Sequence, residues 1–181
     1  MRSKVLAISA ISAAFIAISL TIGVYVEIAD LISLVVASAF VVMPIYLRSY
    51  KGSFLAFLVG GVIALLFCFS KFYSIVFPAY VIFFGIYPII SLWAREKKVK
   101  RVIYYIVGII WSIAFFYGAY FYYTSFLGLD LGEFPSWMQF VANNFLYFIC
   151  PFAVVFYFVF DRYVNVVKMF YDRILTKVIK S

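Results

Sequence analysis

The strongest constraint in this sequence is a succession of six apolar runs, none of which has a charged residue in its interior. Each run is long enough to cross a hydrocarbon core, which takes roughly 17–25 helical residues. The runs are Val5–Val24, Leu31–Leu47, Ser53–Ser70, Ser74–Ala94, Val102–Thr124 and Gln139–Phe160. The sequence therefore predicts an all-α, polytopic membrane protein: a bundle of six transmembrane helices.

The composition agrees with a membrane protein rather than a soluble domain. Hydrophobic residues make up 68% of the 181 residues, and charged residues only 12%. A soluble domain of this length could not bury so much apolar surface, because its surface is too large relative to its volume. We expect a transmembrane domain over residues 1–160 and a cytoplasmic tail over residues 161–181.

The basic residues predict the orientation of the chain. If the N-terminus is cytoplasmic, every Lys and Arg except Lys71 lies inside, while Glu27, Asp30, Asp130 and Glu133 lie outside. Cytoplasmic loops carry an excess of Lys and Arg. We therefore expect a multi-pass protein of the cell (plasma) membrane with both termini in the cytoplasm. This orientation also explains the net charge of +8 without nucleic-acid binding.

The tail differs from the rest of the chain, because apolar residues recur there at helical spacing with basic residues between them. The basic residues are Arg162, Lys168, Arg173, Lys177 and Lys180. This pattern predicts a basic amphipathic helix that continues the last span or lies on the inner leaflet. Attraction to anionic lipid explains it, and docking to a cytoplasmic partner is the alternative.

Motifs for catalysis are missing from the sequence. There is no His, which is the commonest catalytic base and metal ligand, and there is no Walker A, GxSxG, HExxH or CxxC motif. Cys68 and Cys150 lie in separate apolar runs, where a cysteine usually acts as a small hydrophobe. We expect no enzyme activity, no catalytic residue, no metal and no cofactor. Without an ATP site, the chain cannot energise transport by itself.

The first run is rich in small residues. It contains two pairs of alanines, and the members of each pair are four residues apart: Ala10 with Ala14, and Ala13 with Ala17. Residues four apart lie on the same side of a helix. Small residues at this spacing let another membrane helix approach closely. Such a stripe packs inside the chain's own bundle or contacts another membrane subunit, and both interpretations remain open here.

A few polar and aromatic residues are candidates for ligand binding: Lys71, Tyr80, Tyr87, Trp137, Asn143 and Asn144. Amides and phenols within a membrane need hydrogen-bond partners. Helix-to-helix hydrogen bonds and aromatic packing would satisfy them without a ligand. Lys71 pairs with external carboxylates or meets an anionic group of a ligand.

The size, the six spans, the inward termini and the alanine-rich first helix together resemble the substrate-binding S components of energy-coupling factor (ECF) vitamin transporters. The segment Phe83–Ile90 also resembles one found in uncharacterised small bacterial membrane proteins. The resemblance implies that Ala10 and Ala14, or Ala13 and Ala17, contact a transmembrane coupling subunit. It also implies vitamin binding near the external face.

From this resemblance we expect a substrate-capture subunit of a multi-subunit uptake transporter. A coupling subunit and ATPase subunits on separate chains would drive the cycle, and membrane lipid and a small-molecule ligand would complete the partners. The alternative is a non-transport membrane scaffold or assembly protein that acts through helix–helix contacts and its basic cytoplasmic tail.

Overall fold

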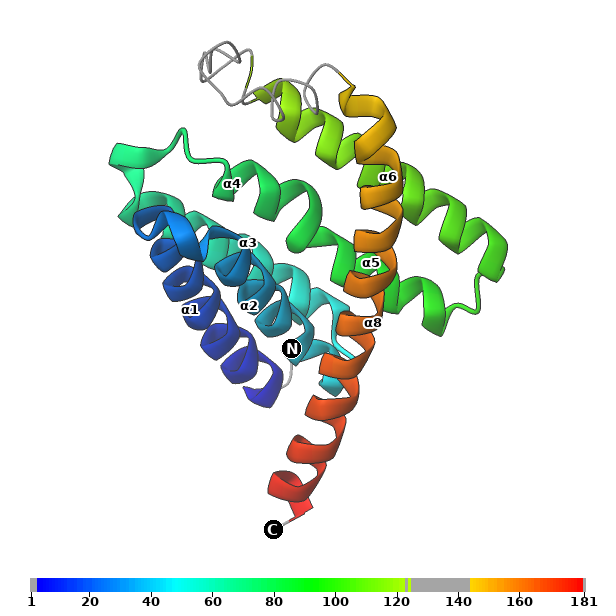
Figure 1. Cartoon of the computed structure of the whole chain (residues 1–181). Coiled ribbons are helices and arrows are strands. Elements are labelled where there is room, and N and C mark those ends of the chain that lie inside the picture. Colours follow the sequence, from blue (N-terminus) through cyan, green and yellow to red (C-terminus); the bar gives the residue numbers. More distant parts are fainter. Residues whose placement is uncertain (1–2, 123, 125–143, 181) are drawn as a thin grey trace. The chain divides into compact units, whose positions relative to one another are not determined.

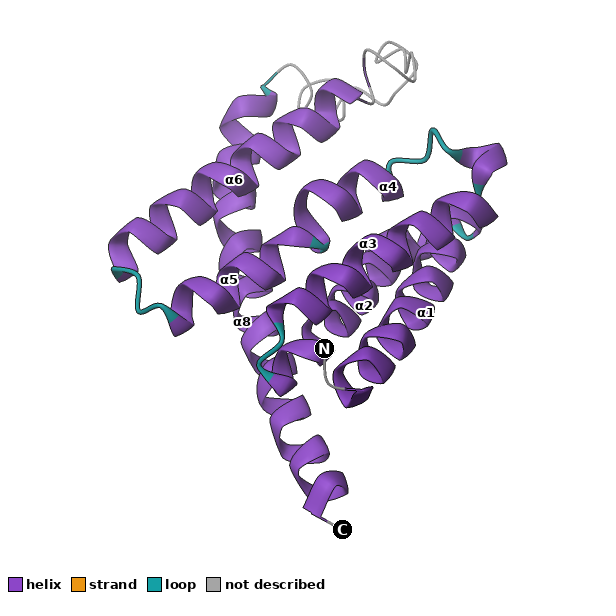
Figure 2. Cartoon of the chain, turned by 180° about the vertical axis from the view of Figure 1, so that it is seen from behind, coloured by secondary structure: helices purple, strands orange, loops and turns teal. Residues whose placement is uncertain are grey.

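The computed structural model describes residues 3–122, 124 and 144–180 of the chain (Figure 1). Within these residues all regular structure is helical and no strand occurs (Figure 2). Six helical segments are long and apolar enough to cross a membrane. The predicted all-α architecture with six apolar spans is thereby confirmed, while the side of the membrane on which each terminus lies stays a prediction.

The helices follow the apolar runs closely. They are α1 (Ser3–Tyr25), α2 (Asp30–Val42), α3 (Tyr50–Phe67), α4 (Val76–Ala79), α5 (Ile86–Glu96), α6 (Arg101–Phe121) and α8 (Phe145–Lys180). A 3-10 turn, Met43–Leu47, extends α2 to the end of its apolar run. Arg48 falls between this turn and α3, and residues 97–100 fall between α5 and α6.

The fourth span is not a single α-helix. A π-helical turn, Tyr80–Phe84, separates α4 from α5, and the Gly85 N–H donates to the Tyr80 carbonyl at 2.7 Å, five residues back. Pro88 follows one turn later and has no N–H to offer the Phe84 carbonyl. The regular ladder is therefore already interrupted here, and a π-turn accommodates the extra residue.

The last span and the predicted tail form one continuous helix. α8 runs through Asp161 to Lys180 without a break and contains Pro151. A helix that continues the last span was one of the two arrangements expected for the tail. Its action as an amphipathic, lipid-binding segment stays a prediction.

The chain separates into two compact units. Unit 1 comprises Met1–Lys98 with Asp161–Ser181, and unit 2 comprises Val99–Phe160. The proposed division at residue 160 into a transmembrane domain and a cytoplasmic tail stays a prediction.

Unit 1 is built around α1, which packs against α2 and α3 (Figures 1 and 2). α1 and α3 approach closely at Gly60 of α3, where an added Cβ would stand 2.7 Å from Ile16 Cγ2 and 2.9 Å from the Ala13 carbonyl oxygen. Ile16 and Ala13 are both buried. Small residues thus let the two backbones come together, as membrane helices require in the absence of a hydrophobic driving force.

Unit 2 pairs α6 with the first part of α8 through small and aromatic residues. The Ser112 hydroxyl donates to the Ala153 carbonyl at 3.0 Å, and both residues are fully buried. The ring of Phe116 stands edge-on to Phe152 and Phe156, with centroids 5.2 and 5.1 Å away. A hydroxyl bonded to a helix carbonyl is satisfied without water, which suits a helix pair in lipid.

Candidate functional site

One end of unit 1 collects basic residues from several helices. An added Cβ at Gly52, in the first turn of α3, would meet the side chains of Ser9 and Val5, so α1 and α3 start at the same end. The Tyr50 hydroxyl donates to the Glu96 carboxylate, which brings the end of α5 there as well. We call this the basic end, because the basic residues of these helix ends gather at it: Lys4, Arg48, Lys51, Arg95, Lys97 and Lys98.

A buried carboxylate connects α8 to α5 at this end. Asp161 is only 6% exposed, and one of its oxygens, Oδ2, forms an ion pair with Arg95. Its other oxygen accepts hydrogen bonds from the Tyr87 hydroxyl at 2.9 Å and the Ser91 hydroxyl at 3.2 Å. A buried charge is tolerated only when it is paired and hydrogen-bonded, and Asp161 is both.

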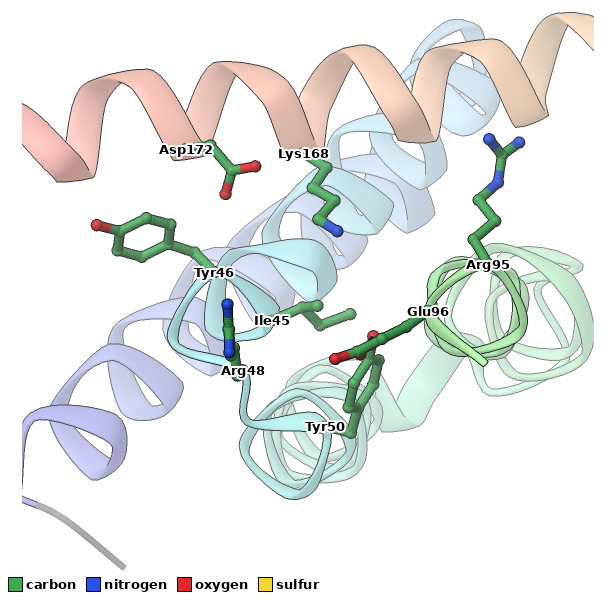
Figure 3. A pocket seen from close by; sticks show the side chains of 8 residues that line it. All are labelled: Ile45, Tyr46, Arg48, Tyr50, Arg95, Glu96, Lys168 and Asp172. Carbon is green, nitrogen blue, oxygen red and sulfur yellow. Dashed lines mark hydrogen bonds between the residues drawn. The ribbon is translucent and has the colours of Figure 1, made fainter. Parts of the chain in front are cut away.

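A polar hollow of about 610 Å³ lies beside this cluster (Figure 3). Eight residues line it: Ile45, Tyr46, Arg48, Tyr50, Arg95, Glu96, Lys168 and Asp172. They come from the segment that joins α2 to α3 together with the first residue of α3, from the end of α5 and from α8. The hollow thus has walls from three parts of the chain that are far apart in sequence.

Two cations in this hollow, Arg48 and Lys168, take part in no ion pair within the described part of the chain. Arg48 belongs to the turn that follows α2 and Lys168 to α8, and both side chains line the hollow (Figure 3). Arg95 differs, because Asp161 neutralises it. Glu96 and Asp172 line the same hollow, so two carboxylates lie beside the two cations. A group that carries both an anion and a cation would suit such a lining.

Arg48 also has an unusual backbone conformation. Its φ is 53°, in the left-handed region, and its N–H caps the 3-10 turn by donating to the Ile45 carbonyl at 2.8 Å. Glycine is the usual residue in such a position, because it has no Cβ penalty. Lys98 has the same φ at the end of α5 but does not line the hollow.

The predicted ligand residues Tyr80 and Tyr87 are buried, and each hydroxyl has a partner in the protein. Tyr80 donates to the Phe57 carbonyl at 3.2 Å, and its ring lies 5.2 Å from that of Phe57. Tyr87 donates to Asp161. Helix-to-helix hydrogen bonding therefore satisfies both phenols, and their role in ligand binding stays a prediction.

Tyr80 also borders an apolar hollow of about 400 Å³ between α3 and the fourth span. The hollow is lined by Phe54, Phe57, Leu58, Gly61, Val62, Leu65, Phe77, Tyr80, Val81 and Ile86. Gly61 leaves room for the Tyr80 ring, since an added Cβ would stand 3.2 Å from it. No charged side chain contributes to this lining.

Among the remaining ligand candidates, Lys71 lies away from the basic end. The Lys71 ammonium lies 5.3 Å from the centre of the Tyr25 ring, at the opposite end of α1. The Asn144 carbonyl accepts from the Tyr147 N–H at 3.0 Å, at the start of α8. Trp137 and Asn143 lie outside the described residues.

The four alanines of α1 divide between two faces. Ala13 and Ala17 are 3% and 5% exposed and belong to the core, whereas Ala10 and Ala14 are exposed. The structure thus uses one pair for packing inside the bundle and leaves the other pair on the surface.

The sequence interpretation missed Asp161, Arg48 and Lys168 as members of a shared polar site. A signal for the ion pair does exist, because Tyr87, Ser91 and Arg95 are four residues apart and form a polar stripe on a helix. Asp161 directly follows the last apolar run, just as Arg95 directly follows the fourth. No comparable spacing in the sequence connects Arg48 with Lys168.

Comparison with known proteins assigns no family to this chain. No protein-family model, no curated protein and no solved structure matches it. Functional inference therefore depends on the residues and geometry described above.

Proposed function

We propose that this chain is the substrate-capture subunit, similar to an S component, of a multi-subunit ATP-driven uptake transporter for a vitamin or a similar small solute. The observation that carries the proposal is the exposed alanine pair of α1, Ala10 and Ala14. The six apolar helices and the lack of a nucleotide-binding motif in the sequence support it.

The exposed alanines lie beside bulky side chains on one side of the helix. Ile11 and Phe15 follow Ala10 and Ala14 directly in the sequence and are 47% and 46% exposed. A strip of small residues flanked by large ones lets a second helix approach closely in lipid. Because Ala13 and Ala17 already serve the chain's own bundle, Ala10 and Ala14 remain for a membrane partner, the coupling subunit of the proposal.

The proposed orientation places the basic end in the cytoplasm and Lys71 outside. It rests on the positive-inside rule, since the helix ends that meet at the basic end carry Lys and Arg while the end near Lys71 carries Glu27 and Asp30. In this orientation the solute enters from the Lys71 side. From the sequence alone, we propose that Trp137, Asn143 and Asn144 lie on the same outer side of the membrane and contribute to solute binding.

Co-purification tests the partner. The tagged full chain, extracted in mild detergent, is expected to bring down a membrane subunit and an ATPase, identified by mass spectrometry. The double variant Ala10→Leu/Ala14→Leu should lose both partners, because two leucines fill the strip. Ala114→Leu, at an exposed alanine of α6, is the matched control and should retain them.

Ligand capture is tested separately by thermal denaturation of the purified chain with a panel of vitamins and precursors. One of them is expected to raise the melting temperature. If none does and no ATPase co-purifies, the transport proposal is wrong. Recovery of an envelope-assembly complex with the chain would instead favour the scaffold or assembly protein.

A further inference from the structure

We infer that the polar hollow at the basic end binds the phosphodiester of a phospholipid headgroup from the adjacent leaflet, held between Arg48 and Lys168. This site goes beyond the proposed transport function. Within unit 1 it lies at the end opposite to Lys71, and its lining includes none of the residues proposed for solute capture.

The charges of the lining provide the first argument. Arg48 and Lys168 enter the hollow from the α2–α3 turn and from α8, and neither is committed to an ion pair within the described residues (Figure 3). A guanidinium presents a fork of donors that matches phosphate oxygens, and an ammonium adds a point charge. Two cations from separate parts of the chain thus suit one oxyanion between them.

The carboxylates of the lining limit which anion fits. Glu96 and Asp172 border the same hollow, so the charges of these two carboxylates balance those of Arg48 and Lys168. A singly charged phosphodiester is compatible with this balance, whereas a polyphosphate would meet the carboxylates with several charges. A headgroup amine could also lie against Glu96, which keeps acceptor capacity beside its bond from Tyr50.

The position of the hollow along the helices provides the second argument. The second candidate span ends at Leu47, the third begins at Tyr50 and the fourth ends at Glu96, and all three boundaries border the hollow. Headgroups lie at the level where apolar spans end, and tyrosines such as Tyr46 and Tyr50 are enriched there. Basic pockets between transmembrane helices are known to hold lipid headgroups.

The volume is sufficient for such a group. Ligand pockets in proteins typically measure roughly 300–1,000 Å³, and this hollow measures about 610 Å³. Tyr50 and Ile45 supply apolar surface beside the charges, against which the glycerol and upper acyl chain can pack. The same walls would leave a free phosphate ion poorly enclosed.

Arg48→Gly tests the inference without weakening the backbone. Glycine suits a φ of 53°, so this variant removes the cation and is expected to fold at least as well as the native chain. Lys98→Gly is the matched control, because it removes one positive charge at the same φ but outside the hollow. Lys168→Gln removes the second cation, which belongs to α8.

The measurement is native mass spectrometry of the full chain in detergent, titrated with phosphatidylethanolamine. Loss of a charged hydrogen-bond partner should weaken binding roughly 10- to 100-fold in Arg48→Gly and in Lys168→Gln. The native chain and Lys98→Gly should retain the lipid equally. A parallel thermal titration with inorganic phosphate, without lipid, should leave the melting temperature unchanged.

Equal lipid retention by all four proteins would overturn the inference. Stabilisation by inorganic phosphate without lipid retention would overturn it too, because the source of the phosphate would then be soluble. Loss of lipid from Lys98→Gly as well would mean that overall charge, and not the hollow, binds the lipid. None of these results depends on whether a vitamin or an ATPase binds the chain.

Discussion

Single residues set how closely the helices of this bundle approach each other. Gly60 faces Ile16 and the Ala13 carbonyl at distances that no Cβ tolerates, whereas nothing lies within 4 Å of a Cβ placed on Gly118. The two glycines therefore differ in role, although both stand inside apolar helices. The close packing of α1 on α3 requires a glycine at position 60, whereas a side chain fits at position 118.

We predict that Gly60→Ala lowers stability by about 1–3 kcal/mol, because α1 must move away from α3 to admit the methyl group. Gly118→Ala should be neutral or stabilise the protein by up to about 1 kcal/mol, because alanine favours a helix. The melting temperatures of the two variants are compared by thermal denaturation in detergent, with the monodisperse fraction of protein as the readout. Equal melting temperatures would contradict the close packing of α1 on α3.

The Tyr87 hydroxyl gives a second prediction. Tyr87→Phe removes a donor to Asp161 and should lower stability by about 1 kcal/mol, a typical value for one buried hydrogen bond. Tyr117→Phe is the control, because Tyr117 is 53% exposed on α6 and should tolerate loss of its hydroxyl. The same thermal assay measures both. A larger effect in Tyr117→Phe would rule out the hydrogen-bond network as the cause.

Among the helices, α5 and α8 depend on a contact between charged side chains. Arg95 of α5 and Asp161 of α8 form an ion pair, supported by hydroxyls from Tyr87 and Ser91. Asp161 is buried, while the Arg95 side chain is 35% exposed and therefore partly solvated. The pair thus joins α8 to the end of the fourth candidate span.

We predict that Asp161→Asn lowers stability by about 1–3 kcal/mol, less than for a fully buried pair because water screens Arg95. Arg95→Gln should cost more than Asp161→Asn, because it leaves the buried Asp161 carboxylate without its cation, whereas Arg95 is partly solvated. The double variant should cost less than the two single changes combined. Lys97→Gln, at an exposed neighbour, should stay within about 0.5 kcal/mol of the native chain. Additive effects in the double variant would show that the pair does not couple α5 to α8.

The six spans could be predicted from the sequence, because apolar length alone decides whether a helix can cross lipid. The π-turn at Tyr80–Phe84 could not be predicted, because Pro88 indicates that the helix is interrupted but not whether by a kink or by a π-turn. Asp161 was assigned to the tail because a run defined by the absence of charge ends at the first carboxylate. Its partner Arg95 lies on another helix, so only the fold shows that the charge is neutralised.

Ala10 and Ala14 also show what the sequence alone could not predict. Helical spacing predicted two alanine pairs on the first helix, but spacing alone did not decide which pair packs inside. The decision comes from Gly60 and Ile16, whose approach places Ala13 and Ala17 in the core. The polar hollow was beyond prediction as well, because its walls come from three separate parts of the chain.

At the scale of the whole molecule, the distribution of charge predicts the orientation of the chain in the membrane. Lys and Arg gather at the basic end, and Lys71 stands at the opposite end of α1 near Tyr25. The proposed transport function and the proposed entry side for the solute both follow from this polarity through the positive-inside rule. Both proposals therefore depend on the predicted orientation of the chain in the membrane.

Cysteine accessibility tests this orientation most directly. In a chain whose two cysteines, Cys68 and Cys150, are replaced by alanine, Phe72→Cys and Val99→Cys each place one thiol at an exposed position without altering any charge. On intact cells, a membrane-impermeant maleimide should label the thiol at position 72 and reach position 99 only after permeabilisation. Labelling of position 99 but not position 72 on intact cells would contradict the orientation and, with it, the proposed capture of a solute from outside.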